Sequence, residues 1–246
     1  DEAGVPVRVL WRREDVVRRG PKRPPLALAL RADGTGLVRV GCTPGSPDLS
    51  SAHAHLARSC PGVVVEEVTV AGPPVASDLR AAVWGETLGA LHALAADPMP
   101  EGHGKAHVAV PGGGSASVVL RLDEGERGTM TVDVWAGALA SAVTLRSYAL
   151  GAVHQALGLV WSEGIAVDEG GEPLDLTIRS FGILAARDMP EIEVRLHEEE
   201  GWPVNGSDAV FVATLAAAWI AEGLPGRWPT RRAAVRAPRR DVPASS

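Results

Sequence analysis

The chain has 246 residues, of which 46% are hydrophobic and 22% charged, which is enough to bury a core in one large domain or two small ones. Its formal net charge of −6 argues against a general nucleic-acid-binding protein, because such proteins carry a clustered positive face. No apolar run reaches membrane-spanning length, and the N-terminus lacks the apolar core of a signal peptide. We therefore expect a soluble, cytoplasmic protein that binds neither nucleic acid nor membrane.

The cysteines and aromatic residues narrow the chemistry further. Cys42 and Cys60 belong to no CxxC motif, so they cannot build a zinc or iron–sulfur site by themselves, and no metal site is predicted. One disulfide is compatible with the count, but two buried thiols are the expectation. Seven of the ten aromatic residues are tryptophan, and alanine, valine and leucine dominate, which predicts a core of small aliphatic side chains.

Strand-like and helical segments alternate irregularly along the first hundred residues. A hairpin is predicted over residues 26–41, where two β-like runs flank the turn pair Asp33-Gly34. Ser77 is predicted to cap a long helix that continues to about Ala96. The other expected elements are a strand at 5–11, a charged and proline-ended segment after it, a short helix within 43–62 and a strand at 63–70.

The second half of the chain has the same mixed pattern. Residues 98–117 are predicted to be rich in loops, and residues 117–135 to form a second hairpin. The further predicted elements are a helix from Ser147 to Trp161, a strand–turn–strand around 168–171, a half-buried strand at 192–198 and a helix from Ala209 to about Ala221. No regular βαβ rhythm occurs, so the predicted class is α+β, with mixed sheets and packed helices.

Several segments, taken in chain order, resemble the molybdopterin-binding large subunit of the xanthine dehydrogenase/aldehyde oxidase family. The most specific match is the run from Asp188 to Ile192, DMPEI, within "LTIRSFGILAARDMPEIEVRL", which is similar to the family's "FRDYRIPTALDMPEIEV". The other matching segments are "VPVRVLWRREDVVRRGPKRPP", "VTVAGPPVASDLRAAVWGETLGALHALA" and "VDVWAGALASAVTLRSYALGAVHQALGLVWSE". The resemblance implies a pruned version of that family's molybdopterin-binding domain.

The departures from the family pattern bear on the cofactor. The chain starts after the place of the family's glycine-rich loop, and much of the family's pterin-gripping stretch is absent, with "PGGGSAS" bridging the gap. We therefore expect no cofactor on this chain alone, and a molybdenum–pterin cofactor only if a partner chain completes the site. The resemblance implies two α+β lobes, 1–104 and 105–230, followed by a basic, proline-containing flexible tail at 231–246.

Asp208 is the first catalytic candidate, because it falls at the position of the family's catalytic glutamate. A carboxylate there can move protons, especially between apolar walls. Asn205, Ser207 or Asp208 at a helix start is also typical of an N-cap, which satisfies free N–H groups. Both interpretations stay open.

Five other residues are candidates for the site. Arg80 matches an arginine close to the family's cofactor and is able to hold a carboxylate or an oxyanion, or else it is a surface residue of a helix start. His154 replaces an apolar family residue and is either a buried histidine with one backbone partner or a general acid. Gln155, Trp84 and Ser207 are the candidate substrate-binding residues.

Three functions remain. The first is a cofactor-free small-molecule enzyme that uses acid/base chemistry, such as isomerisation, cyclisation or dehydration, with Asp208 and either Arg80 or His154. The second is a subunit of a split molybdenum-dependent oxidoreductase with companion subunits. The third is a non-catalytic ligand-binding or assembly protein. A small-molecule substrate and either a homodimer or companion oxidoreductase subunits are the expected partners, since a trimmed scaffold exposes faces that were once buried.

Overall fold

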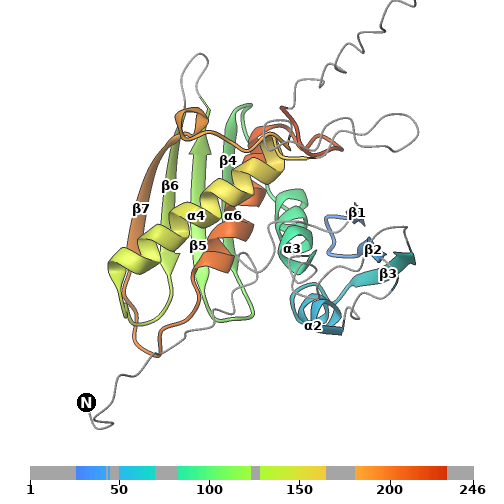
Figure 1. Cartoon of the computed structure of the whole chain (residues 1–246), viewed down its shortest axis with the longest axis horizontal. Coiled ribbons are helices and arrows are strands. Elements are labelled where there is room, and N and C mark those ends of the chain that lie inside the picture. Colours follow the sequence, from blue (N-terminus) through green and yellow to red (C-terminus); the bar gives the residue numbers. More distant parts are fainter. Residues whose placement is uncertain are drawn as a thin grey trace, which may run out of the picture.

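The computed structural model describes residues 26–42, 44, 50–69, 83–122, 128–164 and 181–231, which form two sheets with helices packed against them (Figure 1). The α+β class is confirmed. The predicted strand at 5–11 and the strand–turn–strand around 168–171 lie outside the described residues. The division into two lobes and the flexible tail stay predictions.

The first sheet has three strands in the order β1-β2-β3. β1 (Leu26–Leu30) and β2 (Gly36–Cys42) form the predicted antiparallel hairpin, whose turn is held by the Asp33 carboxylate as it accepts hydrogen bonds from Thr35 N at 2.9 Å and Thr35 Oγ1 at 2.6 Å. The predicted short helix is α2 (Ser50–Ser59), and the predicted strand is β3 (Val63–Thr69), parallel to β2. Both cysteines are thiols, and burial raises the pKa of Cys60 to about 12.

The second sheet has four strands in the order β4-β5-β6-β7. β4 (His103–Ala109), β5 (Ser115–Arg121) and β6 (Thr129–Trp135) are antiparallel neighbours, and β7 (Glu191–His197) runs parallel to β6. Buried and exposed residues alternate along these strands, because successive side chains point to opposite faces of a sheet. One face therefore packs on helices and the other carries polar side chains.

The prediction of a loop-rich segment at 98–117 is wrong, because β4 occupies 103–109 and β5 begins at 115. The inward-facing residues of β4 are Gly104, Ala106 and Val108, and two of these are too small to produce a hydrophobic strand pattern. The "PGGG" run is the turn of the β4–β5 hairpin, since Val110 N donates to Gly114 O at 2.9 Å.

Two helices cover one face of the second sheet, and a third packs beside them (Figure 1). α4 (Ala142–Trp161) begins five residues before the predicted Ser147, because the Ser141 hydroxyl caps it by accepting from Thr144 N at 3.3 Å. α6 (Ser207–Ala221) and α3 (Val83–Leu94) pack against each other. The predicted cap Ser77 lies outside the described residues. In the described ranges, no helix has both the length and the apolar character needed to cross a membrane.

α6 approaches β4 so closely that only glycine fits at the point of contact. A Cβ atom added to Gly104 would collide with the backbone oxygen of Ala217 in the middle of α6. A helix backbone cannot move away from one strand without losing its contacts with its other neighbours, so this position tolerates no side chain.

We expect Gly104→Ala to lower the free energy of unfolding by about 3 kcal/mol, because the new methyl group must displace a helix backbone. Gly112→Ala is the matched control, since a Cβ atom there meets nothing within 4 Å, and we expect a change within about 0.5 kcal/mol. Urea unfolding followed by circular dichroism measures both values. Equal stabilities of the two variants would contradict the described contact between β4 and α6.

Candidate functional site

The candidate site lies at the end of the second sheet where β6 and β7 finish, here called the β6–β7 end. The chain leaves β6 at Ala136 to enter α4 and leaves β7 to enter α6, and these two connections are joined by a hydrogen bond from Val204 N to Ala136 O at 2.9 Å. The β4–β5 turn reaches the same place, since a Cβ atom on Gly114 would lie 2.7 Å from Asn205 O. Carboxyl ends of parallel strands are a common place for ligand sites in open sheets.

Asp208 lies in the first turn of α6 and is 9% exposed. The N-cap residue of this helix is Gly206, with no side-chain hydrogen bond, so Asp208 is not the capping residue. The Asn205 Oδ1 atom instead accepts from Ser207 N at 2.9 Å and from Ser207 Oγ at 2.7 Å. A negative charge in the first turn is favoured by the helix dipole, so this position suits a carboxylate whether or not it is catalytic.

The start of α6 presses on the helix-covered face of β6. A Cβ atom on Gly206 would lie 2.9 Å from Val134 Cγ1 and 3.1 Å from Ala136 Cβ. Trp135 lies between these two residues in the strand and therefore points to the opposite face. Asp208 is thus on the helix side of the β6–β7 end.

His154 is anchored elsewhere along α4. Its Nε2 atom contacts Leu184 O at 2.7 Å, and because a carbonyl only accepts, Nε2 carries the proton. Leu145, which faces Gly206 across the helix interface, precedes His154 by nine residues, or about 13 Å of helix. His154 therefore lies farther along α4 than the point where α4 meets the start of α6. Gln155, the next residue of α4, is partly buried.

The remaining predicted residues lie at or before the start of α3. Trp84 is 3% exposed, and the helix turn that holds it faces α6, since a Cβ atom on Gly85 would lie 3.6 Å from Val212 Cγ2. Arg80 lies outside the described residues. The roles given to Arg80, Trp84 and Gln155 stay predictions.

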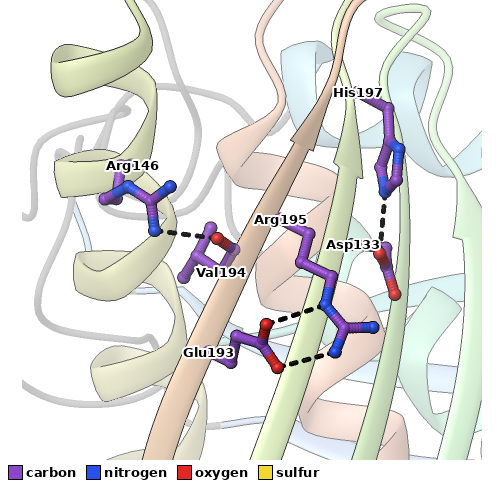
Figure 2. A network of polar contacts seen from close by, with 6 residues as sticks. All are labelled: Asp133, Arg146, Glu193, Val194, Arg195 and His197. Atoms are coloured by element: carbon purple, nitrogen blue, oxygen red, sulfur yellow. Dashed lines mark hydrogen bonds and ion pairs between the residues drawn. The ribbon is translucent and has the colours of Figure 1, made fainter.

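The opposite face of the β6–β7 end holds a cluster that the sequence did not reveal. His197 Nε2 contacts Asp133 Oδ1 at 2.7 Å, with side chains 40% and 23% exposed (Figure 2). Trp135 stacks on His197 with ring centroids 4.6 Å apart and an interplanar angle of 13°. His107 from β4 meets Trp135 edge-on at 5.9 Å. We call Asp133, Trp135 and His197 the open-face cluster.

The signal for this cluster is the strand register rather than any motif. Trp135 is paired with His197, and Asp133 with Arg195, across two parallel strands that are far apart in the sequence. The alternation in "TMTVDVW" and "EIEVRLH" indicates which residues point outward, but it does not say that the two strands are neighbours.

An ion pair borders the open-face cluster on β7. Arg195 Nη2 lies 2.7 Å from Glu193 Oε2, and Figure 2 shows this pair on the same face as Asp133. The hydrogen bond from Arg195 lowers the pKa of Glu193, so the pair is charged at neutral pH. The guanidinium also gives the Asp133 carboxylate a positively charged neighbour, since the two residues are directly paired in the register.

The polar side chains at the two helix starts bear on the expectation that this chain alone holds no molybdenum–pterin cofactor, which stays a prediction. Such a group needs many converging hydrogen-bond partners in a deep cleft. The polar side chains at the two helix starts are bonded to one another instead: Ser141 to Thr144, and Asn205 to Ser207. Their hydrogen-bonding capacity is largely used within the chain.

No protein-family model matches the chain, and no curated protein matches its sequence. The comparison with solved structures matches parts of several oxidoreductases at low identity. Quinoline 2-oxidoreductase from Pseudomonas putida 86 is 16% identical with a TM-score of 0.37, over 78% of this chain and 34% of that chain. The CO dehydrogenase from Oligotropha carboxidovorans is 10% identical with a TM-score of 0.37, over 79% of this chain and 33% of that chain. The aldehyde oxidoreductase from Desulfovibrio desulfuricans ATCC 27774 is 16% identical with a TM-score of 0.33, over 81% of this chain and 28% of that chain.

The chain therefore spans about a third of the length of the solved proteins that it matches. At these identities the likeness concerns the fold alone.

His92 on α3 provides a pH test of how α3 sits near β4. Burial lowers the pKa of His92 from 6.5, and the neighbouring charge of His107 lowers it further. As the pH falls, the unfolded chain takes up the proton before the folded protein does. The stability linked to neutral His92 is therefore full above pH 6.5 and is lost as the pH falls from 6.5 through the lowered pKa of the folded protein.

We expect the free energy of unfolding to fall less in His92→Gln than in the wild type between pH 7.5 and pH 5.5, as measured by urea titration. An unchanged slope in His92→Gln would contradict the burial of this imidazole.

Proposed function

We propose that this chain is a cofactor-free enzyme that performs acid/base chemistry on a small molecule at the open-face cluster. The observation that supports this proposal is the 2.7 Å contact between His197 Nε2 and Asp133 Oδ1. A carboxylate that holds one ring nitrogen of a histidine fixes the orientation of the ring. The other nitrogen, Nδ1, is then the atom that exchanges a proton with a substrate.

The surroundings of His197 limit the direction from which a substrate can approach. Trp135 covers one face of the imidazole, so a ligand reaches the ring from its edge or from the other face. The Trp135 indole offers an apolar surface, and the His107 ring beside it offers a polar edge. Together they suit a small ring or a carbonyl compound. Abstraction of a proton next to a carbonyl suits this arrangement, and that step begins isomerisations, cyclisations and dehydrations.

Asp208 is the alternative acid/base residue within the same proposal. It lies on the helix side of β6, beside Ser207, and its partner in this alternative is Arg80, whose position the family resemblance implies, since His154 lies farther along α4. Since β6 separates the two locations, one substrate molecule does not contact both carboxylates. Substitution of each in turn therefore distinguishes them.

We expect the full chain in D₂O to catalyse exchange of the hydrogens next to the carbonyl group in at least one member of a panel of small ketones, aldehydes and hydroxy acids, as followed by proton NMR. His197→Gln and Asp133→Asn should each slow this exchange by about 100-fold or more, because the positioned base is removed or misoriented. His103→Gln, at the other end of β4, is the control and should keep the wild-type rate.

Exchange that survives both substitutions but is lost in Asp208→Asn would move the chemistry to the helix side. Absence of exchange across the whole panel would contradict the enzymatic proposal.

A second candidate function is that of a subunit in a split molybdenum-dependent oxidoreductase. The observation that favours it is Trp202, which is 89% exposed in the connection between β7 and α6, where a companion chain would cover it. In that case the protein purified from its native host would contain molybdenum in stoichiometric amount together with partner chains. A colourless, molybdenum-free protein with the exchange activity described above would exclude this candidate.

A further inference from the structure

β7 has a strand neighbour on one side only among the residues that the structure describes. The other side carries backbone groups that β6 does not use, and one of them, Val194 O, accepts a hydrogen bond from Arg146 Nη1 at 2.8 Å. In Figure 2 this contact lies on the side of β7 away from Asp133 and His197. An outer strand of this kind is a template for pairing with another chain.

The sequence of β7 is complementary to itself when read in the antiparallel direction. "EIEVRLH" has Val194 at its centre, two acidic residues before it and two basic-type residues after it. If two copies pair about Val194, Glu193 faces Arg195 of the partner subunit and Glu191 faces His197 of the partner subunit. On the other face, Ile192 meets Leu196 of the partner subunit, and the two Val194 side chains meet each other.

Backbone geometry agrees with this register. A strand residue points its N–H and C=O groups to the same side, so Val194, whose carbonyl faces outward, forms the hydrogen-bonded pair at the centre of an antiparallel ladder. A carbonyl oxygen has two lone pairs, so Val194 O can accept from a partner strand as well as from Arg146.

α4 adds apolar surface next to this edge. Val143 is 81% exposed and Leu150 is 39% exposed, and both lie on the same side of the helix as Arg146, at spacings of three and four residues. Because Arg146 reaches the outer edge of β7, these two apolar side chains lie beside that edge. Strand pairing alone buries little surface, since stable interfaces cover about 1,600 Å², so a contribution from α4 is needed.

We propose that two copies of this chain associate through antiparallel pairing of β7 with β7 about Val194, with Val143 and Leu150 of α4 completing the interface. The assembly has twofold symmetry and joins the two four-stranded sheets into one sheet of eight strands. The open-face clusters of the two subunits then lie near the junction, since His197 faces Glu191 of the partner subunit.

Sedimentation velocity of the full chain over a range of concentrations measures the dimer dissociation constant. We expect Glu193→Arg to raise this constant by about tenfold, because it places like charges opposite each other at two symmetric positions. The double variant Glu193→Arg/Arg195→Glu restores opposite charges across the axis and should return the constant to the wild-type value. Glu101→Arg, a charge reversal just before β4 at the opposite edge of the sheet, is the matched control and should leave it unchanged.

Val143→Glu tests the helical part of the interface. This side chain is 81% exposed in the single chain, so its replacement should leave the melting temperature of the dissociated protein unchanged while it weakens the dimer. Circular dichroism at concentrations below the dimer dissociation constant checks that each variant is folded.

Two results would overturn the proposal. The first is a wild-type protein that stays a single chain at all concentrations, which would make Arg146 a cover that keeps the β7 edge from pairing. The second is a dimer whose dissociation constant does not respond to Glu193→Arg and Val143→Glu. Neither result bears on the acid/base proposal, because hydrogen exchange in the substrate panel is measured separately.

Discussion

The close approach of α6 to its neighbours is the constraint on which the rest of the structure depends. This helix contacts β4 and β5 beneath it, α3 on one side and α4 on the other. Such crowding is possible only where side chains are small: Gly104 touches the helix backbone, and a Cβ atom on Gly89 of α3 would lie 2.7 Å from Leu215 Cδ2. Alanine fills much of the helix itself, and nearly all of α6 is buried. The sparse aromatic content of the chain follows from this packing.

Crowding on one face of the second sheet determines what the other face can do. Since α4 and α6 take the inward-facing residues of every strand, the outward positions are left to polar side chains, as is usual for a sheet with one wet face. Asp133 and Trp135 on β6 and His197 on β7 therefore meet because of the strand register, with β6 between them and Asp208. The fold thus provides two separate places for a carboxylate, one dry and one partly wet.

Local patterns predicted most of the elements, and long-range pairing explains what they missed. The two predicted hairpins are confirmed, because turn residues and alternation are local signals. β4 was missed because Gly104 and Ala106 give no hydrophobic pattern, although they are the residues that α6 requires. The open-face cluster was missed because Asp133 and His197 are 64 positions apart. Asp208 could be found only through the family resemblance, which says nothing about its burial.

β7 links the packing, the candidate chemistry and the proposed assembly. Its inward residue Val194 packs beneath the helices, its outward residue His197 belongs to the open-face cluster, and its outer edge is reached by Arg146 of α4. A strand that shifted by one residue would exchange all of these positions, because inward and outward side chains alternate. Pairing of two β7 strands would hold that register from both sides, and it would add a carboxylate from the partner subunit near each His197. Association and acid/base chemistry would then share β7, with Asp133 and Trp135 of β6 serving the chemistry and α4 serving the interface.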